Sequence, residues 1–273
     1  MKQSQFYYLL RRGLFSAGSA IIKSGLVMFN KFTTAGLSFP VQGSAGFNGT
    51  SDNLNAGNVL NQGTANATYS FWLYRKNTSV TRVVLAKTNG GSITANYGFI
   101  VLIDSTNKLN YYTSDDDNSQ NRSSVDLGTS YDENWHHFVI VVDKSQDRAS
   151  IYIDGSAQSV AKALGDLSAV DNVTNSIDFK IGSESDSQFF FNGNLANVAI
   201  WNRALSSDEI NSVMWKPVQA LTATESNGLQ AWYSLDDIAS PTASLATMEQ
   251  LATDKDVTIE NTAAITAAIN KLS

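Results

Sequence analysis

The chain has 273 residues, of which 42% are hydrophobic and 16% are charged, and it contains no cysteine. A chain of this size and composition is globular, needs no disulfide framework and accommodates one large β domain with extensions. The net charge of −6 is unevenly spread: residues 1–36 carry five basic residues and no acidic one, so the remaining residues total −11. An acidic body argues against nucleic-acid binding, which favours a basic surface.

Residues 1–36 form a basic, apolar N-terminal arm. Its longest uncharged run is too short to span a bilayer, so we predict no membrane span. Only ten uncharged residues lie between Arg12 and Lys23, and they make a poor hydrophobic region for a signal peptide. Two interpretations fit the arm: an extra strand or helix packed on the main domain, or a tether held by a partner. Its five cations are Lys2, Arg11, Arg12, Lys23 and Lys31.

Residues 37–216 are predicted to form the main domain, built from β-strands. Runs rich in β-branched and aromatic residues occur at 69–74, 82–87, 97–103 and 108–113, with turn-forming residues between them. Strands at this spacing favour a two-sheet sandwich. The polar stretch 114–122 is predicted to be a loop.

The stretch 134–201 carries the strongest strand signals. In the run 135–143, Phe138, Ile140 and Val142 share one face while Val139 and Val141 share the other. A strand that is apolar on both faces must be covered on both. We expect the following residues to be buried between two sheets: Trp72, Trp135, Phe138, Val141, Ile153 and Trp201.

Two blocks of this stretch resemble one family. Trp135 to Gly155 resembles the WHH–strand–turn–strand–DG hairpin of laminin-G-like and pentraxin-like domains, and Gly193 to Ile210, GNLANVAIWNRALSSDEI, resembles their closing strand and helix start. The resemblance implies an all-β, concanavalin-like jelly-roll sandwich of two antiparallel sheets, and binding far more often than catalysis. Independently, Ser206 and Glu209 have the spacing of a helix capping box.

Residues 217–273 are predicted to form a C-terminal extension. The run Gly228 to Asp237 resembles a strand that flanks domains of this family. Two short helices are predicted to follow. One has Leu245, Met248 and Leu251 on a shared face, and the other has Ile265, Ile269 and Leu272.

A candidate calcium site also follows from the resemblance. Glu184 and Asp186 lie in a segment similar to the pentraxin G-x-E-x-D calcium ligands, and Asn89 matches loosely a second ligand loop, where the family has an acidic pair. The two carboxylates alternate by two, so they could point the same way, and hard oxygen ligands suit calcium. The alternative interpretation is an ordinary solvated loop.

Catalysis is not predicted. Laminarinase-type enzymes on this fold use E-x-D-x-x-E, and the position of the third acid is Phe189 here, so the pair Glu184 and Asp186 lacks its proton donor. His136 and His137 are adjacent on a strand and face opposite sides, which is typical of framework residues. A Ser-His-Asp set cannot be assembled from spacing alone.

The predicted function is therefore non-enzymatic. The first hypothesis is a virion component, such as a phage capsid-decorating, fibre or tail protein, that contacts other copies or other virion proteins through residues 1–36. It rests on the lack of cysteine, the poor export signal, the basic arm and a fold used for surface binding. The alternative is a secreted or surface carbohydrate-binding lectin module, extracellular and binding glycans.

Overall fold

A computed structural model describes residues 43–235, apart from 77–79, 89–97, 116–118, 129–130, 132 and 185–188. The arm of residues 1–36 and the two predicted C-terminal helices lie outside the described residues. The chain divides into the units Met1–Ser38 and Phe39–Ser273, and every described residue belongs to the second. Among the described residues, no helix is long and apolar enough to cross a membrane.

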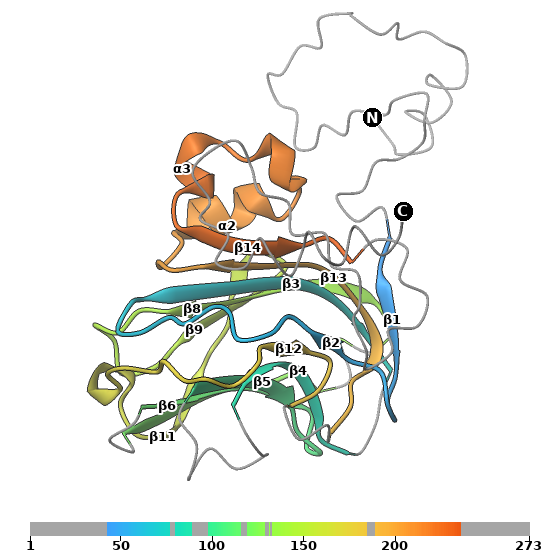
Figure 1. The fold of residues 1–273 in the computed structure, drawn as a ribbon, viewed down its shortest axis with the longest axis horizontal. Helices are drawn as coiled ribbons and strands as arrows, with labels where there is room; N and C mark the ends of the chain where they lie inside the picture. The colour runs from blue at the N-terminus through green and yellow to red at the C-terminus, as the bar shows by residue number, and fades with distance from the viewer. Residues whose placement is uncertain are drawn as a thin grey trace, which may run out of the picture. The chain divides into compact units, whose positions relative to one another are not determined.

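The described part of the chain folds into two antiparallel seven-stranded sheets, stacked face to face (Figure 1). The first sheet has the order β1-β13-β3-β8-β9-β10, and β14 also pairs with β13. Its strands are β1 Ala45–Asn48, β13 Asn192–Trp201, β3 Ala67–Arg75, β8 Trp135–Val142, β9 Ser150–Ile153, β10 Ser156–Ala157 and β14 Leu229–Tyr233. This arrangement confirms the predicted jelly-roll sandwich.

The second sheet has the order β11-β7-β6-β5-β4-β12-β2. Its strands are β11 Ala161–Leu164, β7 Gln120–Asp126, β6 Lys108–Ser114, β5 Gly98–Ile103, β4 Arg82–Lys87, β12 Lys180–Ile181 and β2 Leu54–Asn55, and the 3-10 helix η2, Leu167–Ala169, follows β11 in the chain. The prediction of a loop at 114–122 was wrong at its end, because β7 begins at Gln120. Its sequence, QNRSSVD, is polar, so it lacks the apolar alternation that marks a strand.

The main core lies between the sheets and follows from strand alternation. Phe138, Ile140 and Val142 of β8 point into it and are at most 2% exposed. Across the core, Phe99 and Tyr111 of the second sheet contact Tyr69, with ring centroids 4.6 and 5.8 Å apart. Because every second residue of each strand enters this layer, the core joins all the long strands of both sheets.

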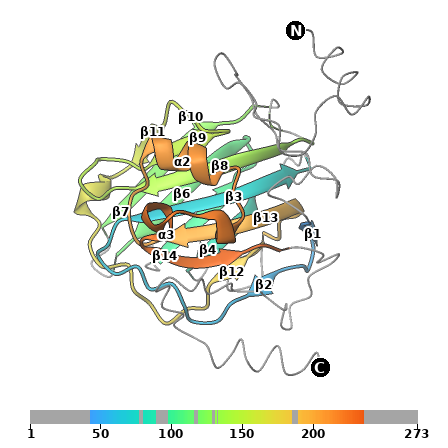
Figure 2. The ribbon, with the colours of Figure 1, turned by 90° about the horizontal axis from the view of Figure 1, so that it is seen from above.

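A second apolar layer covers the other face of the first sheet. Val139 and Val141 of β8 pack there with Trp201 and residues of α2, Ser207–Val213. The helices α2, η3 (Val218–Ala220) and α3 (Ala223–Ser226) lie on this face, above the sheet in Figure 1, and α2 lies over β8 and β9 in Figure 2. The strand at 135–142 is therefore covered on both faces, as its sequence predicts.

This layer corrects the predicted burial of four residues. Phe138 and Ile153 lie between the sheets as expected. Val141 and Trp201 are buried, but under the helices, and Trp72 packs with Met214 on the same outer face. Trp135 was predicted wrongly, because it is 38% exposed at the start of β8. Sequence alternation identifies the two faces of a strand but not what covers each of them.

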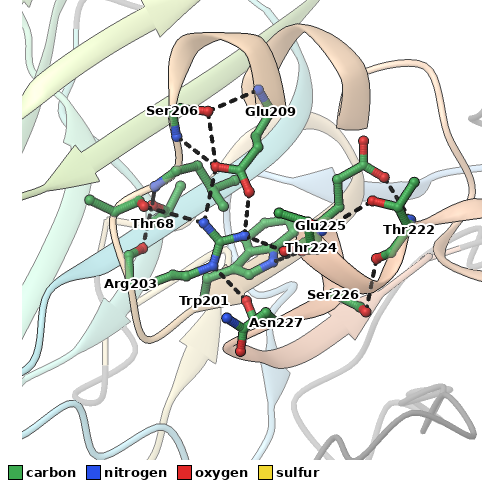
Figure 3. Close-up of polar contacts among 12 residues, drawn as sticks. Thr68, Trp201, Arg203, Ser206, Glu209, Thr222, Thr224, Glu225, Ser226 and Asn227 are labelled. Carbon is green, nitrogen blue, oxygen red and sulfur yellow. Dashed lines mark hydrogen bonds and ion pairs between the residues drawn. The ribbon is translucent and has the colours of Figure 1, made fainter.

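The Arg203 side chain joins the two helical segments to each other (Figure 3). Its guanidinium donates to both carboxylate oxygens of Glu209, at 3.0 and 2.6 Å, and to the carbonyls of Thr224 and Asn227, at 2.7 and 2.6 Å. Glu209 also caps α2 through Ser206, which confirms the predicted capping box. One side chain thus joins the start of α2 to the last turn of α3.

Glu225 secures the second short helix. Its side chain and that of Thr222 form a capping box, Lys216 Nζ lies 2.5 Å from Glu225 Oε1, and the indole N–H of Trp201 donates to its carbonyl at 2.7 Å. Burial disfavours the charged carboxylate, but hydrogen bonds from Lys216, Ser212 and Thr222 outweigh it and lower the pKa of Glu225 to about 2. The ionised form therefore supports this layer at neutral pH.

Candidate functional site

The predicted calcium ligands are only partly visible. Asp186 and Asn89 lie outside the described residues, whereas Glu184 is 1% exposed just after β12. Gly182 starts this segment with a φ of +87°, and a Cβ there would lie 2.4 Å from the ring of Phe47, so the close packing requires glycine. Among the described residues, no group of three or more His, Asp or Glu side chains could hold a metal ion. The calcium site stays a prediction.

The register around β4 bears on how such a site could be assembled. The N–H of Gly182 donates to the carbonyl of Val84 at 2.8 Å, so the chain runs from there toward the start of β4. Thr88 follows the opposite end of the same strand. Glu184 and Thr88 are therefore reached from opposite ends of β4.

The structure pairs one serine with one histidine that sequence spacing could not connect. Ser70 Oγ lies 2.8 Å from His137 Nε2, and Asp154 accepts the backbone N–H of His137 at 2.9 Å while its other oxygen lies 2.7 Å from His136 Nδ1. Ser70 and His137 are 3% and 2% exposed, and burial lowers the pKa of His137 to about 4. Asp154 thus holds the backbone of β8 at His137. Ser70 and His137 are both buried, as residues with a structural role usually are.

A third group of side chains has the composition of a binding site and was missed by sequence reasoning. Four residues meet on the outward face of the second sheet, and we call them the polar cluster: Asp104, Asn110, Tyr112 and Arg122. Leu109 and Tyr111 of β6 point into the core, so Asn110 and Tyr112 point outward. Arg122 on β7 pairs directly with Tyr112, and Asp104 follows β5.

The polar cluster is held by a closed set of contacts. The Arg122 guanidinium lies 4.9 Å from the centroid of the Tyr112 ring, and its Nε donates to Asn110 Oδ1 at 2.9 Å. Asn110 in turn donates to Asp104 Oδ2 at 2.9 Å, and an Arg122 Nη lies 3.4 Å from the same oxygen. Burial raises the pKa of Asp104, but hydrogen bonds from Thr106, Asn110 and Lys108 outweigh it and lower the pKa. The carboxylate therefore stays charged and fixed.

Tyr112 is the apolar part of the polar cluster, and buried side chains support its partly exposed ring. Tyr112 packs against Val83, Ala86, Ile100 and Leu102, which form a small apolar group on the same face. Arg122 and Asp104 keep 31% and 18% of their side chains exposed. An aromatic ring, guanidinium donors and a carboxylate acceptor thus occur together in fixed positions. The signal was hidden in the sequence because it depends on the register of β6 against β7, and β7 was not recognised as a strand.

Comparison with known proteins gives one sequence match and several structural ones. A laminin-G family model, described as the concanavalin A-like lectin/glucanases superfamily, matches residues 48–211, which is more than half of the chain. None of the curated proteins matches the sequence.

The similarities to solved structures concern the fold alone. The heptameric SAP-like pentraxin of Limulus polyphemus is 18% identical, with 63% of this chain and 81% of that chain covered and a TM-score of 0.46. The botulinum neurotoxin serotype G binding domain is 16% identical, with 57% of this chain covered and a TM-score of 0.44. The receptor binding domain of botulinum neurotoxin D is 18% identical, with 63% of this chain covered and a TM-score of 0.46. This chain spans only 37% and 42% of those two toxin domains.

Proposed function

This chain belongs to the concanavalin A-like lectin/glucanases superfamily, and from that membership we propose that it is a non-enzymatic protein that binds carbohydrate on the outward face of its second sheet. The observation that carries the proposal is the polar cluster. Its ring, guanidinium, amide and carboxylate are fixed by one another, so a ligand meets them without further ordering of these side chains.

The chemistry of the polar cluster matches that of a sugar ring. A pyranose presents C–H groups on its faces and hydroxyls around its edge. Tyr112, which is partly exposed, offers surface for the C–H groups, while Arg122 can donate to hydroxyls and Asp104 can accept from them. Charged partners make such hydrogen bonds stronger than neutral ones.

We expect Tyr112→Ala and Arg122→Met each to weaken glycan binding about tenfold or more, the equivalent of about 1.4 kcal/mol. The measurement is a glycan array with the full chain, followed by titration of the best glycan. Trp215→Ala is the matched control, since Trp215 is an exposed aromatic residue on the opposite layer of the molecule. Equal binding by all variants, with unchanged melting temperatures, would remove the polar cluster from the proposal.

The same titration with calcium or with a chelator tests the metal prediction. A calcium-dependent affinity that Glu184→Gln abolishes would support a site at Glu184, Asp186 and Asn89. Calcium-independent binding that is sensitive to Tyr112 would support the polar cluster alone. The two sites can therefore be separated by one set of measurements.

We further propose that the binding protein works in a virion, as a capsid-decorating, fibre or tail component. The support comes from residues 1–36, which combine five cations with a largely apolar sequence, whereas the rest of the chain is acidic. Such a segment suits a complementary surface on another copy or another virion protein. The other candidate is a secreted or surface lectin module, for which this arm would have no role in assembly.

Deletion of residues 1–36 is expected to leave a folded, soluble protein that no longer joins its assembly. Size-exclusion chromatography with light scattering, and incorporation into particles, would measure this outcome. The melting temperature of the truncated protein should stay close to that of the full chain, since the proposed role of the arm is in assembly. A truncated protein that still assembles would favour the secreted or surface module.

A further inference from the structure

Four aromatic side chains lie together on the helix-bearing face of the first sheet, and we call Trp72, Tyr74, Trp135 and Trp215 the aromatic strip. The ring centroids of Trp215 and Trp72 are 5.6 Å apart, and those of Tyr74 and Trp135 are 5.9 Å apart. Trp72 and Tyr74 are two residues apart on β3, so their side chains share a face. Trp72 also packs with Met214, which directly follows α2, so this face is the one that carries the helices.

The strip is an exposed aromatic surface without net charge at its border. Trp215 is 54% exposed and Trp135 is 38% exposed. Lys76 lies two residues after Tyr74 and Glu133 lies two residues before Trp135, and these two exposed residues carry opposite charges. A contiguous exposed aromatic surface of this kind marks an interaction site for an apolar partner.

The described part of the chain ends one strand away from the strip. The N–H of Asn197 donates to the carbonyl of Ser234 at 3.0 Å, so the chain still lies beside β13 just after β14. The next residue, Leu235, is 4% exposed and packs in the main core. Ala196, which precedes Asn197, pairs with Trp72 across β13 and β3. Residues after Leu235 are therefore tethered close to the strip, which gives them a high effective concentration there.

The chain cannot continue along β13 beyond Leu235. The place beside Leu195 of β13 is taken by Ala45 of β1, and both residues are fully buried in the main core. Leu235 has a φ of +61°, which turns the backbone out of the extended path of β14. Because the core side of the sheet is closed at this point, the ways out that remain are the helix-bearing face and the edge of the sheet.

We propose that residues 238–252, which we call the C-terminal segment, dock on the aromatic strip of their own molecule. The helix predicted in this segment has Leu245, Met248 and Leu251 on a shared face. A helix this short needs packing to be stable, and an apolar helix face laid on a hydrophobic surface is a recurring docking mode. The thioether of methionine also makes favourable contacts with aromatic rings.

The charge of the C-terminal segment suits the strip. Between Asp237 and Asp254 the only charged residue is Glu249, so the segment is almost neutral and can cover the rings without burying several charges. A second copy is a weaker candidate for the same surface. Residues 37–273 total −11, so two copies brought face to face repel each other.

The lengths allow this docking. Neighbouring strands are about 4.8 Å apart, so β3 lies about 10 Å and β8 about 14 Å from the line of β14. The nine residues 236–244 can span up to about 30 Å when extended. Leu245 and the residues of its predicted helix can therefore reach every ring of the strip while Leu235 stays in the core.

Hydrogen–deuterium exchange of the full chain, read by mass spectrometry, tests the proposal from the side of the segment. Amides within residues 245–252 should exchange at least about tenfold more slowly than their unstructured rate. In Trp215→Ala most of this protection should be lost, because the most exposed ring of the strip is gone while the fold keeps its core. Phe189→Ala, which removes another aromatic residue that is 40% exposed, is the matched control and should change nothing.

Hydroxyl-radical footprinting tests the proposal from the side of the strip. In Leu245→Ser/Met248→Ser the oxidation of Trp215 should rise severalfold, because the apolar cover is lost without any change to the jelly roll. Ile265→Ser/Ile269→Ser makes the same chemical change in the other predicted C-terminal helix. It is the matched control and should leave the oxidation of Trp215 unchanged.

Several results would overturn the proposal. Residues 245–252 could exchange at the unstructured rate, or keep their protection in Trp215→Ala. Protection that disappears on dilution would make a second copy the partner of the strip. If Trp215→Ala released residues 1–36 and not residues 245–252, the N-terminal arm would be the occupant. The inference does not depend on carbohydrate binding, because variants of the polar cluster should leave exchange of the C-terminal segment unchanged.

Discussion

Trp201→Ala is expected to lower the free energy of unfolding by about 3–5 kcal/mol, the cost typical of removing a large aromatic side chain from a core. Trp201 is fully buried under the helices, and its ring meets that of Trp232 edge-on at 6.3 Å. Its indole N–H donates to the carbonyl of Glu225, which would lose its partner in a buried place. Urea denaturation followed by circular dichroism measures the change.

Trp135→Ala is the matched control, with an expected cost of about 1 kcal/mol or less. Trp135 is 38% exposed and its ring contacts only Tyr74 among the aromatic residues described. Both substitutions remove a tryptophan side chain, one from β13 and the other from β8. The difference between their losses in free energy of unfolding therefore reports how much the packing of Trp201 under the helices stabilises the protein. Similar losses from both would show that the layer over Trp201 does not stabilise the sheet.

The two-sheet core could be predicted from sequence because strand alternation determines it. The alternation in 138–142 identifies two apolar faces, and both are buried. The capping box at Ser206 and Glu209 was predictable for the same reason, since it is a local contact within one turn. Local rules thus predicted where elements lie and which residues face inward.

What could not be predicted depends on contacts between distant segments. The sequence pattern predicts Trp135 to be a core residue, but it is 38% exposed, because alternation along a strand does not say which segments cover its ends. The polar cluster joins residues of β6 and β7 to Asp104, which follows β5, and the alignment of these strands cannot be predicted from a polar strand such as β7. Ser70 and His137 are brought together in the same way, by the pairing of β3 with β8. Sequence therefore indicated the fold but not the candidate site.

Arg203→Met is expected to destabilise the protein by about 2–3 kcal/mol, because it removes the partner of a carboxylate and of two carbonyls at once. Methionine keeps most of the apolar stem, so the loss reports the guanidinium. Arg203 and Glu209 are 24% and 16% exposed, so solvent screens their interaction only in part. Arg148→Met is the matched control: the Arg148 and Asp147 side chains are each 44% exposed, so solvent screens their interaction and the substitution should change stability much less.

A double-mutant cycle separates the ion pair from the rest of the network. Glu209→Gln keeps a side chain that can cap α2 through Ser206 but removes the charge that Arg203 meets. If the pair is coupled, the free energy of unfolding lost by the double variant should be smaller than the sum of the two single losses. The expected difference is at least about 1 kcal/mol. Strict additivity would mean that the carbonyls of Thr224 and Asn227, and not Glu209, account for the role of Arg203. In either case the loss should appear as a weakened connection between α2 and α3, because the Arg203 guanidinium bonds to residues of both helical segments.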